Sequence, residues 1–447
     1  MCEIVRRSAS VNRSFRHCAD NETSAGGGPY DNGPARQSRR REVDMPFSRS
    51  SCDDRQSSIA ACRSGRSAGN GTSSVLVCFP LPGDRLGGSS ISALNLIRHL
   101  DRQRYEPLVL MHKADGAVAR LFEDEGVPFE PAPLADCASG ADPTGDLRFA
   151  LRNTGLLVRY LRRRGVGIVH TNDGRMHATW AIPSRLAGAR LLWHHRGDPR
   201  AAGLRFLAPW VADRVISVSK FSAPRPGLIS AARKCTVIYN PFATDAEPVD
   251  RASSRQTLLD QLGSSPTAHV VGFVGNFYGR KRPLLFVETI ARMAAREPDR
   301  EITAPMFGDA RTPEVAAAIE RHGLRDRVHL MGFRYPPEPW IAACDVLLVP
   351  AVEEPFGRTL IEAMLLGTPL IAANSGGFPE IIRHGETGYL VPADDADAFA
   401  ERTLALLDDP AVRASIAARG RQDAVARFGM QRHAQSIMQI YDSILTH

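Results

Sequence analysis

Long apolar runs are missing from this sequence. None of its 447 residues lies in an uninterrupted apolar stretch of the roughly 18 residues that a membrane-spanning helix needs, which argues against an integral membrane protein. Aromatic residues are also few, at 7% of the chain. With 43% hydrophobic and 23% charged residues, the composition is typical of a globular protein. The length predicts two domains plus additional segments.

Cysteine pairs are missing as well. The eight cysteines include no Cys-x-x-Cys pair and have no histidine at the spacing of a zinc site. Free thiols in a reducing cytosol therefore explain them better than a disulfide framework or a bound metal does. We expect a cytoplasmic protein that can also lie at the inner face of the membrane.

A strong excess of one charge is missing from most of the chain. Residues 1–72 hold twelve arginines and eight acidic residues, whereas the rest holds 44 basic and 41 acidic residues. Because this larger part is nearly balanced, we expect no nucleic-acid partner. Residues 1–72 are rich in Arg, Ser and Gly, and their apolar residues follow no period. Such a segment buries too little surface to offset its chain entropy, so the sequence predicts a disordered tail.

Alternating strand-like and helix-like segments begin at "SSVLVCFP", residues 73–80. A polar stretch with two prolines near 240–250 interrupts the alternation, which starts again at "HVVGFVGNF". The rhythm is typical of parallel sheets that helices cover on both faces. We predict an α/β protein of two doubly wound, Rossmann-like domains, 73–245 and 246–425, and a helix at 426–447 that packs back toward the first domain. Ligands of such sheets bind beyond the carboxyl ends of the strands.

Two acidic residues flank the start of an apolar helix in "EEPFGRTLIEAMLLG", residues 353–367. Glu354 follows the apolar strand "VLLVPAV", and Glu362 lies about one turn inside the helix. Free N–H groups at such a helix start attract an anion, and a glycine there lets a phosphate approach the backbone. The free N–H groups here are those of Phe356, Gly357, Arg358 and Thr359. Carboxylates on either side can accept hydrogen bonds from hydroxyls, so the pattern suits a nucleotide sugar; alternatively, the acids only stabilise the first helical turn.

The same region resembles the donor-binding signature of glycosyltransferase family 4, also named glycosyl transferases group 1. The resemblance covers residues 74 to 440 and rests on the two spaced glutamates, "SGGFPEII", "HGETGYLV", "GFVGNFYGRKRP", "MFGD" and "HLMGF". It implies the GT-B fold, in which two Rossmann-like domains face each other across a cleft. It also implies a retaining enzyme that moves a sugar from an NDP-sugar to a hydroxyl of a glycan or lipid-linked acceptor, with no metal and no other cofactor.

The resemblance assigns roles in the second domain. Glu354 would contact the hydroxyls of the donor sugar, and Glu362 would hold the ribose diol. The N–H groups of residues 356–359 would bind the diphosphate. In family members an oxygen of the leaving diphosphate takes the acceptor's proton, so neither glutamate would be a covalent nucleophile.

One of the two cations that the family places at the diphosphate is replaced in this sequence. Lys281 stands at the lysine position, but Asn276 stands where the family usually has arginine. Arg280 or Arg282 is the candidate to supply the missing charge; the alternative is a reshaped donor pocket. Because a helix dipole disfavours a cation at a helix start, a bound anion explains Lys281 better than a solvent-exposed charge does.

Candidate residues in the first domain are two glycines and two histidines. Gly87 and Gly88 in "DRLGGSS" match the family's Gly-Gly loop, which implies a place near the donor phosphates. The segment "LLWHHRGD" is expected to bring His194 and His195 to the cleft side, and its "HRGD" pattern implies that His195 lies near the anomeric carbon. Without the resemblance, a hydrogen-bonded structural histidine is the better interpretation.

An amphipathic helix is predicted at "LRNTGLLVRYLRRRG", residues 151–165. Its arginines indicate either peripheral attachment to anionic lipid or a solvent-exposed face with cations near the helix C-terminus. Two other functions stay open: a nucleotide-sugar epimerase can share the fold, and Asn276 fits a non-catalytic nucleotide-sugar-binding protein. A phosphorylase would need a lysine that binds pyridoxal phosphate, for which the sequence shows no local signature. The donor base, the sugar and the acceptor do not follow from the sequence.

Overall fold

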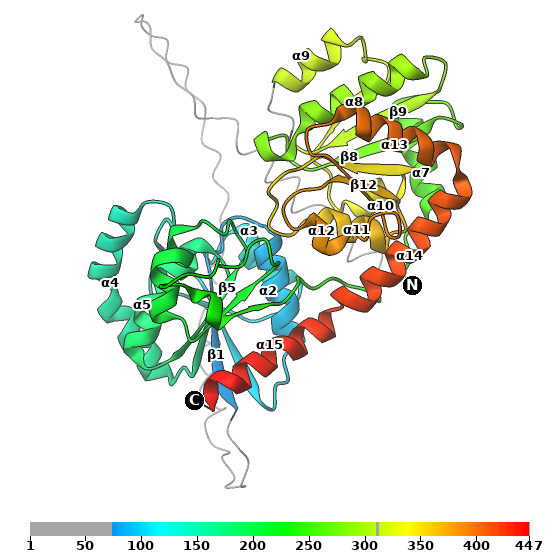
Figure 1. Cartoon of the computed structure of the whole chain (residues 1–447). Coiled ribbons are helices and arrows are strands. Elements are labelled where there is room, and N and C mark those ends of the chain that lie inside the picture. Colours follow the sequence, from blue (N-terminus) through cyan, green and yellow to red (C-terminus); the bar gives the residue numbers. More distant parts are fainter. Residues whose placement is uncertain (1–73, 310–312, 447) are drawn as a thin grey trace, which may run out of the picture. The chain divides into compact units, whose positions relative to one another are not determined.

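Two parallel sheets follow each other along the chain (Figure 1). The computed structural model describes residues 74–309 and 313–446. The first sheet has seven strands in the order β3-β2-β1-β4-β5-β6-β7, and the second has six in the order β10-β9-β8-β11-β12-β13. The predicted α/β architecture with two doubly wound sheets is confirmed. The predicted disordered tail, 1–72, lies outside the described residues.

The strands of both sheets are short. The first sheet contains β1 (Val75–Leu81), β2 (Tyr105–Met111), β3 (Glu130–Pro131), β4 (Ile168–Thr171), β5 (Arg190–His195), β6 (Arg214–Ser217) and β7 (Cys235–Val237). The second contains β8 (His269–Val274), β9 (Ile302–Phe307), β10 (Val328–Gly332), β11 (Val346–Val349), β12 (Leu370–Ala373) and β13 (Tyr389–Val391). Central strands such as β11, "VLLV", are apolar throughout because helices cover both faces of a parallel sheet.

Helices connect the strands. Around the first sheet they are α2 (Gly88–Arg98), α3 (Ala117–Asp124), α4 (Pro143–Arg164), α5 (Gly174–Ala187), η1 (Gly203–Leu207), α6 (Ala208–Val211) and η2 (Ala231–Lys234). Around the second they are α7 (Arg251–Leu262), η3 (Gly279–Lys281), α8 (Pro283–Arg296), α9 (Pro313–Arg321), α10 (Glu338–Ala342), α11 (Arg358–Leu365), α12 (Phe378–Ile381), α13 (Ala396–Asp408) and α14 (Pro410–Phe428). Asp142, Asp173 and Asp250 cap α4, α5 and α7 by accepting hydrogen bonds from first-turn N–H groups.

The strand order of each sheet reverses at one point. β1 and β4 are neighbours in the first sheet, and β8 and β11 are neighbours in the second. In doubly wound sheets the ligand binds beyond the carboxyl ends of the strands at such a switch point. A ligand site is therefore expected at the loops that follow these four strands.

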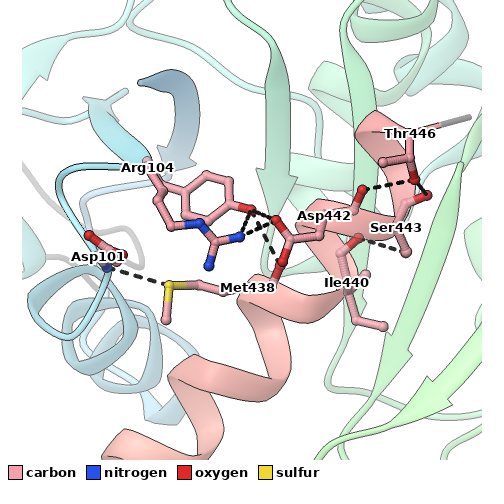
Figure 2. Close-up of polar contacts among 8 residues, drawn as sticks. Asp101, Arg104, Met438, Ile440, Asp442, Ser443 and Thr446 are labelled. Atoms are coloured by element: carbon pink, nitrogen blue, oxygen red, sulfur yellow. Dashed lines mark hydrogen bonds and ion pairs between the residues drawn. The ribbon is translucent and has the colours of Figure 1, made fainter. Parts of the chain in front are cut away.

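The last helix, α15 (Met430–Leu445), packs against the first sheet. Its buried apolar residues, in one cluster with β1, are Ala434, Ile437, Tyr441 and Ile444. Figure 2 shows polar contacts beside this face, where Asp442 accepts hydrogen bonds from Arg104 and from the Tyr105 hydroxyl. The Asp101 N–H donates to the Met438 sulfur at 3.4 Å. The domain bounds predicted from the sequence, 73–245, 246–425 and 426–447, stay predictions.

Candidate functional site

A cavity of about 910 Å³ opens at the switch points of both sheets. Its walls include Gly88 after β1, Asn172 after β4, Lys281 after β8 and Glu354 after β11. Sites for small ligands usually have volumes of about 300–1,000 Å³, so the cavity is large enough for one. Strand ends of both sheets thus border a single binding space.

The start of α11 forms one wall of this cavity, where residues 356–359 line it. Gly357, the residue before the helix, has a φ of 97°, and a Cβ on it would lie 2.6 Å from the Phe378 ring. Both the conformation and the space require glycine. No side chain at this position caps the helix, so the first N–H groups can donate to an anion in the cavity.

Glu354 is buried between two cations. Its Oε1 lies 2.9 Å from Lys281 Nζ and 3.1 Å from Arg280 Nε, and all three side chains line the cavity. The residue is 7% exposed, so the ion pairs compensate for the loss of water around the carboxylate. One acid and two cations in the same wall can bind a ligand that carries both hydroxyl and phosphate groups.

The loop "SGGFPE", residues 375–380, holds the backbone of Glu354. The Gly377 N–H donates to the Glu354 carbonyl at 2.9 Å. Gly376 has a φ of 60°, and a Cβ on it would lie 2.5 Å from the same carbonyl oxygen. Glu353, on the other side, has a φ of 51°, which is uncommon for a residue with a side chain. Close backbone packing therefore fixes the direction of Glu354.

Arg280 and Arg282, the two candidates to supply the missing charge, point to different places. Arg280 lines the cavity, whereas Arg282, with a φ of 56°, pairs with Asp394. Asn276 lies outside the cavity lining, and its carbonyl accepts a hydrogen bond from the Tyr278 N–H at 3.0 Å. The structure thus leaves Arg280 as the arginine that stands beside Lys281.

Two predicted donor residues, Glu362 and Gly87, also lie outside the cavity lining, although Arg358 and Gly88 line it. Glu362 Oε1 lies 3.4 Å from Arg358 Nη2, one turn along α11. Burial raises the pKa of Glu362, and the positive charge of Arg358 opposes this shift. The assignment of Glu362 to a ribose diol stays a prediction.

The two histidines at the end of β5 face opposite ways. His195 lines the cavity, and its Nε2 lies 3.0 Å from the Asp198 carbonyl oxygen. Burial lowers the pKa of His195, which favours the neutral ring. His194 is fully buried, with its Nδ1 3.1 Å from His170 Nε2. The expectation that His194 reaches the cleft side is wrong, because consecutive side chains of a strand point to opposite faces.

Sequence reasoning missed the polar residues that follow β4 and β5. Asn172 and Asp173 follow β4, Arg196 follows β5, and all three line the cavity. Asp173 also accepts a hydrogen bond from the Met176 N–H at 3.1 Å. Their signal in the sequence is their place directly after buried strands, in "VHTND" and "WHHRGD", because the carboxyl ends of parallel strands meet at one edge of the sheet.

Within residues 74–309 and 313–446, no three His, Cys, Asp or Glu side chains are grouped so that they could hold a metal ion. Over the same ranges, no helix combines the length and the apolar character needed to cross a bilayer. Cys78, Cys137, Cys235 and Cys344 are free thiols, which confirms that prediction for these four residues. Burial raises the pKa of Cys344 to about 12, so this thiol is not a nucleophile at neutral pH.

Two family models match consecutive parts of the chain. Residues 86–246 match Glycosyltransferase Family 4, and residues 268–409 match Glycosyl transferases group 1. The chain belongs to this glycosyltransferase family. The resemblance stated from the sequence is confirmed. Residues from both matched segments line the cavity.

Two curated relatives of this chain carry the same name. A D-inositol 3-phosphate glycosyltransferase from Corynebacterium efficiens is 32% identical over 208 residues, which is 44% of this chain and 47% of the relative. A protein of the same name from Thermobispora bispora is 30% identical over 305 residues, which is 63% of this chain and 66% of that protein. The chain spans about half the length of the first of these relatives.

A solved structure shares the fold. The crystal structure of Anabaena HepE in complex with UDP and glucose is 26% identical and has a TM-score of 0.68, with 82% of this chain and 99% of that chain covered. HepE has also been solved in complex with UDP-glucose. The two-sheet architecture of this chain is the GT-B fold, as predicted.

Proposed function

We propose that this glycosyltransferase moves a sugar from an NDP-sugar to a hydroxyl group of an acceptor. One observation carries the proposal: Glu354, Lys281 and the start of α11 border a single cavity at the switch points of two parallel sheets. The HepE complexes with UDP and with UDP-glucose support a uridine nucleotide as the first donor to test.

The donor would bind with its diphosphate at the start of α11. The N–H groups there, together with Arg280 and Lys281, are suited to phosphate oxygens. Glu354 would accept hydrogen bonds from the sugar hydroxyls. Because Glu354 already lies 2.9 Å from Lys281, the cation is in place before the diphosphate arrives, and little reorganisation is needed.

The transfer would retain the configuration of the sugar and use no metal and no other cofactor. The bond from the anomeric carbon to the diphosphate oxygen breaks, the acceptor oxygen bonds to the same face, and its proton moves to the leaving diphosphate. Lys281, Arg280 and the helix start would stabilise the charge that develops on the leaving group. Glu354 is held by two cations, which supports a positioning role over that of a covalent nucleophile.

Exposed apolar side chains border the cavity, which supports a lipid-linked acceptor; a glycan is the alternative. Leu147 and Phe206 border the cavity and are 59% and 67% exposed.

At the C-terminal end of α4, Arg162 donates to the Leu186 carbonyl at 2.7 Å, and Arg164 pairs with Glu130. A peripheral membrane contact of α4 would therefore depend more on its first turns than on its last arginines.

The full chain incubated with a panel of UDP- and GDP-sugars tests the proposal. We expect one donor to bind and to release its NDP when an acceptor is present, and Glu354→Gln to suppress this release. Glu353→Gln is the matched control, because the neighbouring Glu353 side chain is 61% exposed. If no NDP-sugar binds, or if both variants lose activity equally, the proposed role of this site is wrong.

A further inference from the structure

Arg196 lies in the cavity wall contributed by the first sheet, one residue after β5. Its Nη1 donates to the Asn240 side-chain oxygen, and its Nη2 lies 3.3 Å from Asn172 Oδ1. The same Nη2 lies 3.3 Å from His194 Nδ1. Its Nε is buried without a hydrogen-bond partner among the described residues. These contacts fix the guanidinium in the wall but give it no counterion.

The histidines behind Arg196 are neutral. His194 is hydrogen bonded to His170 at 3.1 Å, and its ring centroid lies 6.0 Å from that of His433. Burial lowers the pKa of His170 and of His194 well below the ordinary histidine value, and it lowers the pKa of His433 to about 3. At neutral pH this cluster adds hydrogen-bonding groups and no charge.

The positive charge of Arg196 is therefore poorly balanced. Burial, assisted by the charge of Arg358, lowers the pKa of Arg196 to about 9, while Asp173 acts in the opposite direction. The guanidinium keeps its charge at pH 7. A partly buried charge with no paired counterion among the described residues is costly, and an anionic ligand in the cavity would reduce that cost.

A second arginine borders the same cavity. The Cζ of Arg358 lies 4.4 Å from the centroid of the Phe242 ring, and its Nη1 is buried without a hydrogen-bond partner in the described part of the chain. Its Cδ lies 2.8 Å from where a Cβ on Gly88 would stand. Within residues 74–309 and 313–446, Arg358 forms one ion pair, with Glu362 at 3.4 Å. Two cations beside one cavity repel each other, and a bound anion relieves this repulsion.

We propose that Arg196 binds an oxyanion, a phosphate or carboxylate group, of a ligand in this cavity. A guanidinium presents planar N–H donors that match either group. The inference rests on the proposed function in that it uses the same cavity. The oxyanion is either part of the donor diphosphate, in which case Arg196 stabilises the leaving group, or an acidic group of the acceptor, in which case Arg196 selects the acceptor.

A purely structural Arg196, which only links Asn172 to Asn240, predicts a different result. Its replacement would lower stability and leave ligand affinity unchanged. Two variants separate these possibilities: Arg196→Gln removes the charge but keeps an amide donor, and Arg196→Lys keeps the charge but loses the planar fork. Arg190→Gln is the matched control, because Arg190 stands at the opposite end of β5 and pairs with Asp213 at 3.1 Å.

Calorimetric titrations of the full chain test the inference with two probes. UDP represents the donor diphosphate, and inorganic phosphate, added to the free chain and to the UDP-saturated chain, represents an acidic acceptor. We expect Arg196→Gln to weaken at least one probe by about tenfold or more, the scale of a lost hydrogen bond to a charged group. Arg196→Lys should weaken it less, and Arg190→Gln should change neither. Weaker UDP binding by Arg196→Gln assigns the Arg196 contact to the donor diphosphate. Weaker phosphate binding that is confined to the UDP-saturated chain assigns this contact to the acceptor.

Equal affinities of the wild type and a folded Arg196→Gln variant for both probes would overturn the inference. If Arg196→Gln does not melt cooperatively, the same comparison with Arg196→Lys decides. A wild type that binds phosphate but no nucleotide or NDP-sugar contradicts the proposed function, and its phosphate titrations still decide on Arg196. A wild type that binds neither probe contradicts both.

Discussion

Glu354 and Glu362 belong to one segment but have different surroundings. Glu354 is clamped by Lys281 and Arg280 in the cavity wall, while Glu362 contacts Arg358 outside the lining. Glu354→Gln should lower turnover about a hundredfold, the usual scale for a lost positioning or electrostatic contact. It should not weaken UDP binding, because it leaves both cations free for the diphosphate.

Glu362→Ala should instead weaken UDP binding by about tenfold, if its carboxylate holds the ribose diol. Calorimetry of both variants with UDP and with the NDP-sugar separates the two glutamates. Equal behaviour of the two variants toward UDP would remove the distinction between a sugar contact and a ribose contact. It would also favour the interpretation in which both acids only stabilise the start of α11.

Gly376 tests whether the position of the Glu354 backbone matters. Gly376→Ala would place a Cβ 2.5 Å from the Glu354 carbonyl oxygen, whereas a Cβ on Gly385 would meet no atom within 4 Å. Both glycines have positive φ, 60° and 77°, so both alanine variants carry similar backbone strain. We expect turnover to fall by about tenfold or more only in Gly376→Ala, because small displacements of a positioning group are costly. Similar losses in both variants would attribute the effect to strain alone.

At the scale of elements, α15 packs on the first sheet and brings His433 next to His194 of β5. The Nδ1 of His433, on α15, lies 2.8 Å from the Tyr239 carbonyl oxygen. Because a carbonyl oxygen can only accept, Nδ1 carries the proton and donates it. The Tyr441 hydroxyl lies 2.6 Å from His170 Nδ1. Helix docking thus buries two imidazoles that must stay neutral.

The docking of α15 should make stability depend on pH. The folded pKa values of His170, His194 and His433 lie below the unfolded value, so the unfolded chain binds more protons as pH falls below about 6.5. The free energy of unfolding should therefore decrease from pH 7 to pH 5. Below the unfolded pKa of about 6.5, the decrease approaches about 1.4 kcal/mol per pH unit for each of these histidines.

Chemical denaturation at pH 7, 6 and 5 measures this dependence. His433→Gln, which keeps a donor for the Tyr239 carbonyl, should flatten the profile by the share of one histidine. His322→Gln serves as the control, because His322 is exposed and lies just after α9, far along the chain from α15. A stability that is flat between pH 7 and pH 5 would contradict the assignment of neutral buried rings.

At the scale of the whole molecule, charge neutralisation should need no metal. Arg280, Lys281 and the start of α11 line the cavity from the second sheet, and Arg196 lines it from the first, so cationic groups of both sheets border it. We expect excess EDTA to leave the transfer rate unchanged, and Lys281→Ala to lower it by about a hundredfold without rescue by Mg²⁺ or Mn²⁺. Loss of activity with EDTA, restored by either metal, would indicate a different mechanism.

The sequence by itself determined the two-sheet architecture and the segment that carries Glu354. Alternating apolar strands and amphipathic helices are local patterns, so they identify a parallel α/β fold before any tertiary contact is known. The helix start at residues 356–359 also follows from local chemistry, because a glycine before an apolar helix leaves its first N–H groups free.

Only the tertiary structure decided which strand ends share a cavity and which way each side chain there points. It placed Arg196 beside Asn172 and Asn240, turned His194 away from His195, and paired Arg282 with Asp394 while Arg280 joined Glu354. These contacts join residues far apart along the chain, and they depend on strand order, strand face and local backbone conformation. Local periodicity contains none of this information, because it reports how a segment folds and not which segments meet.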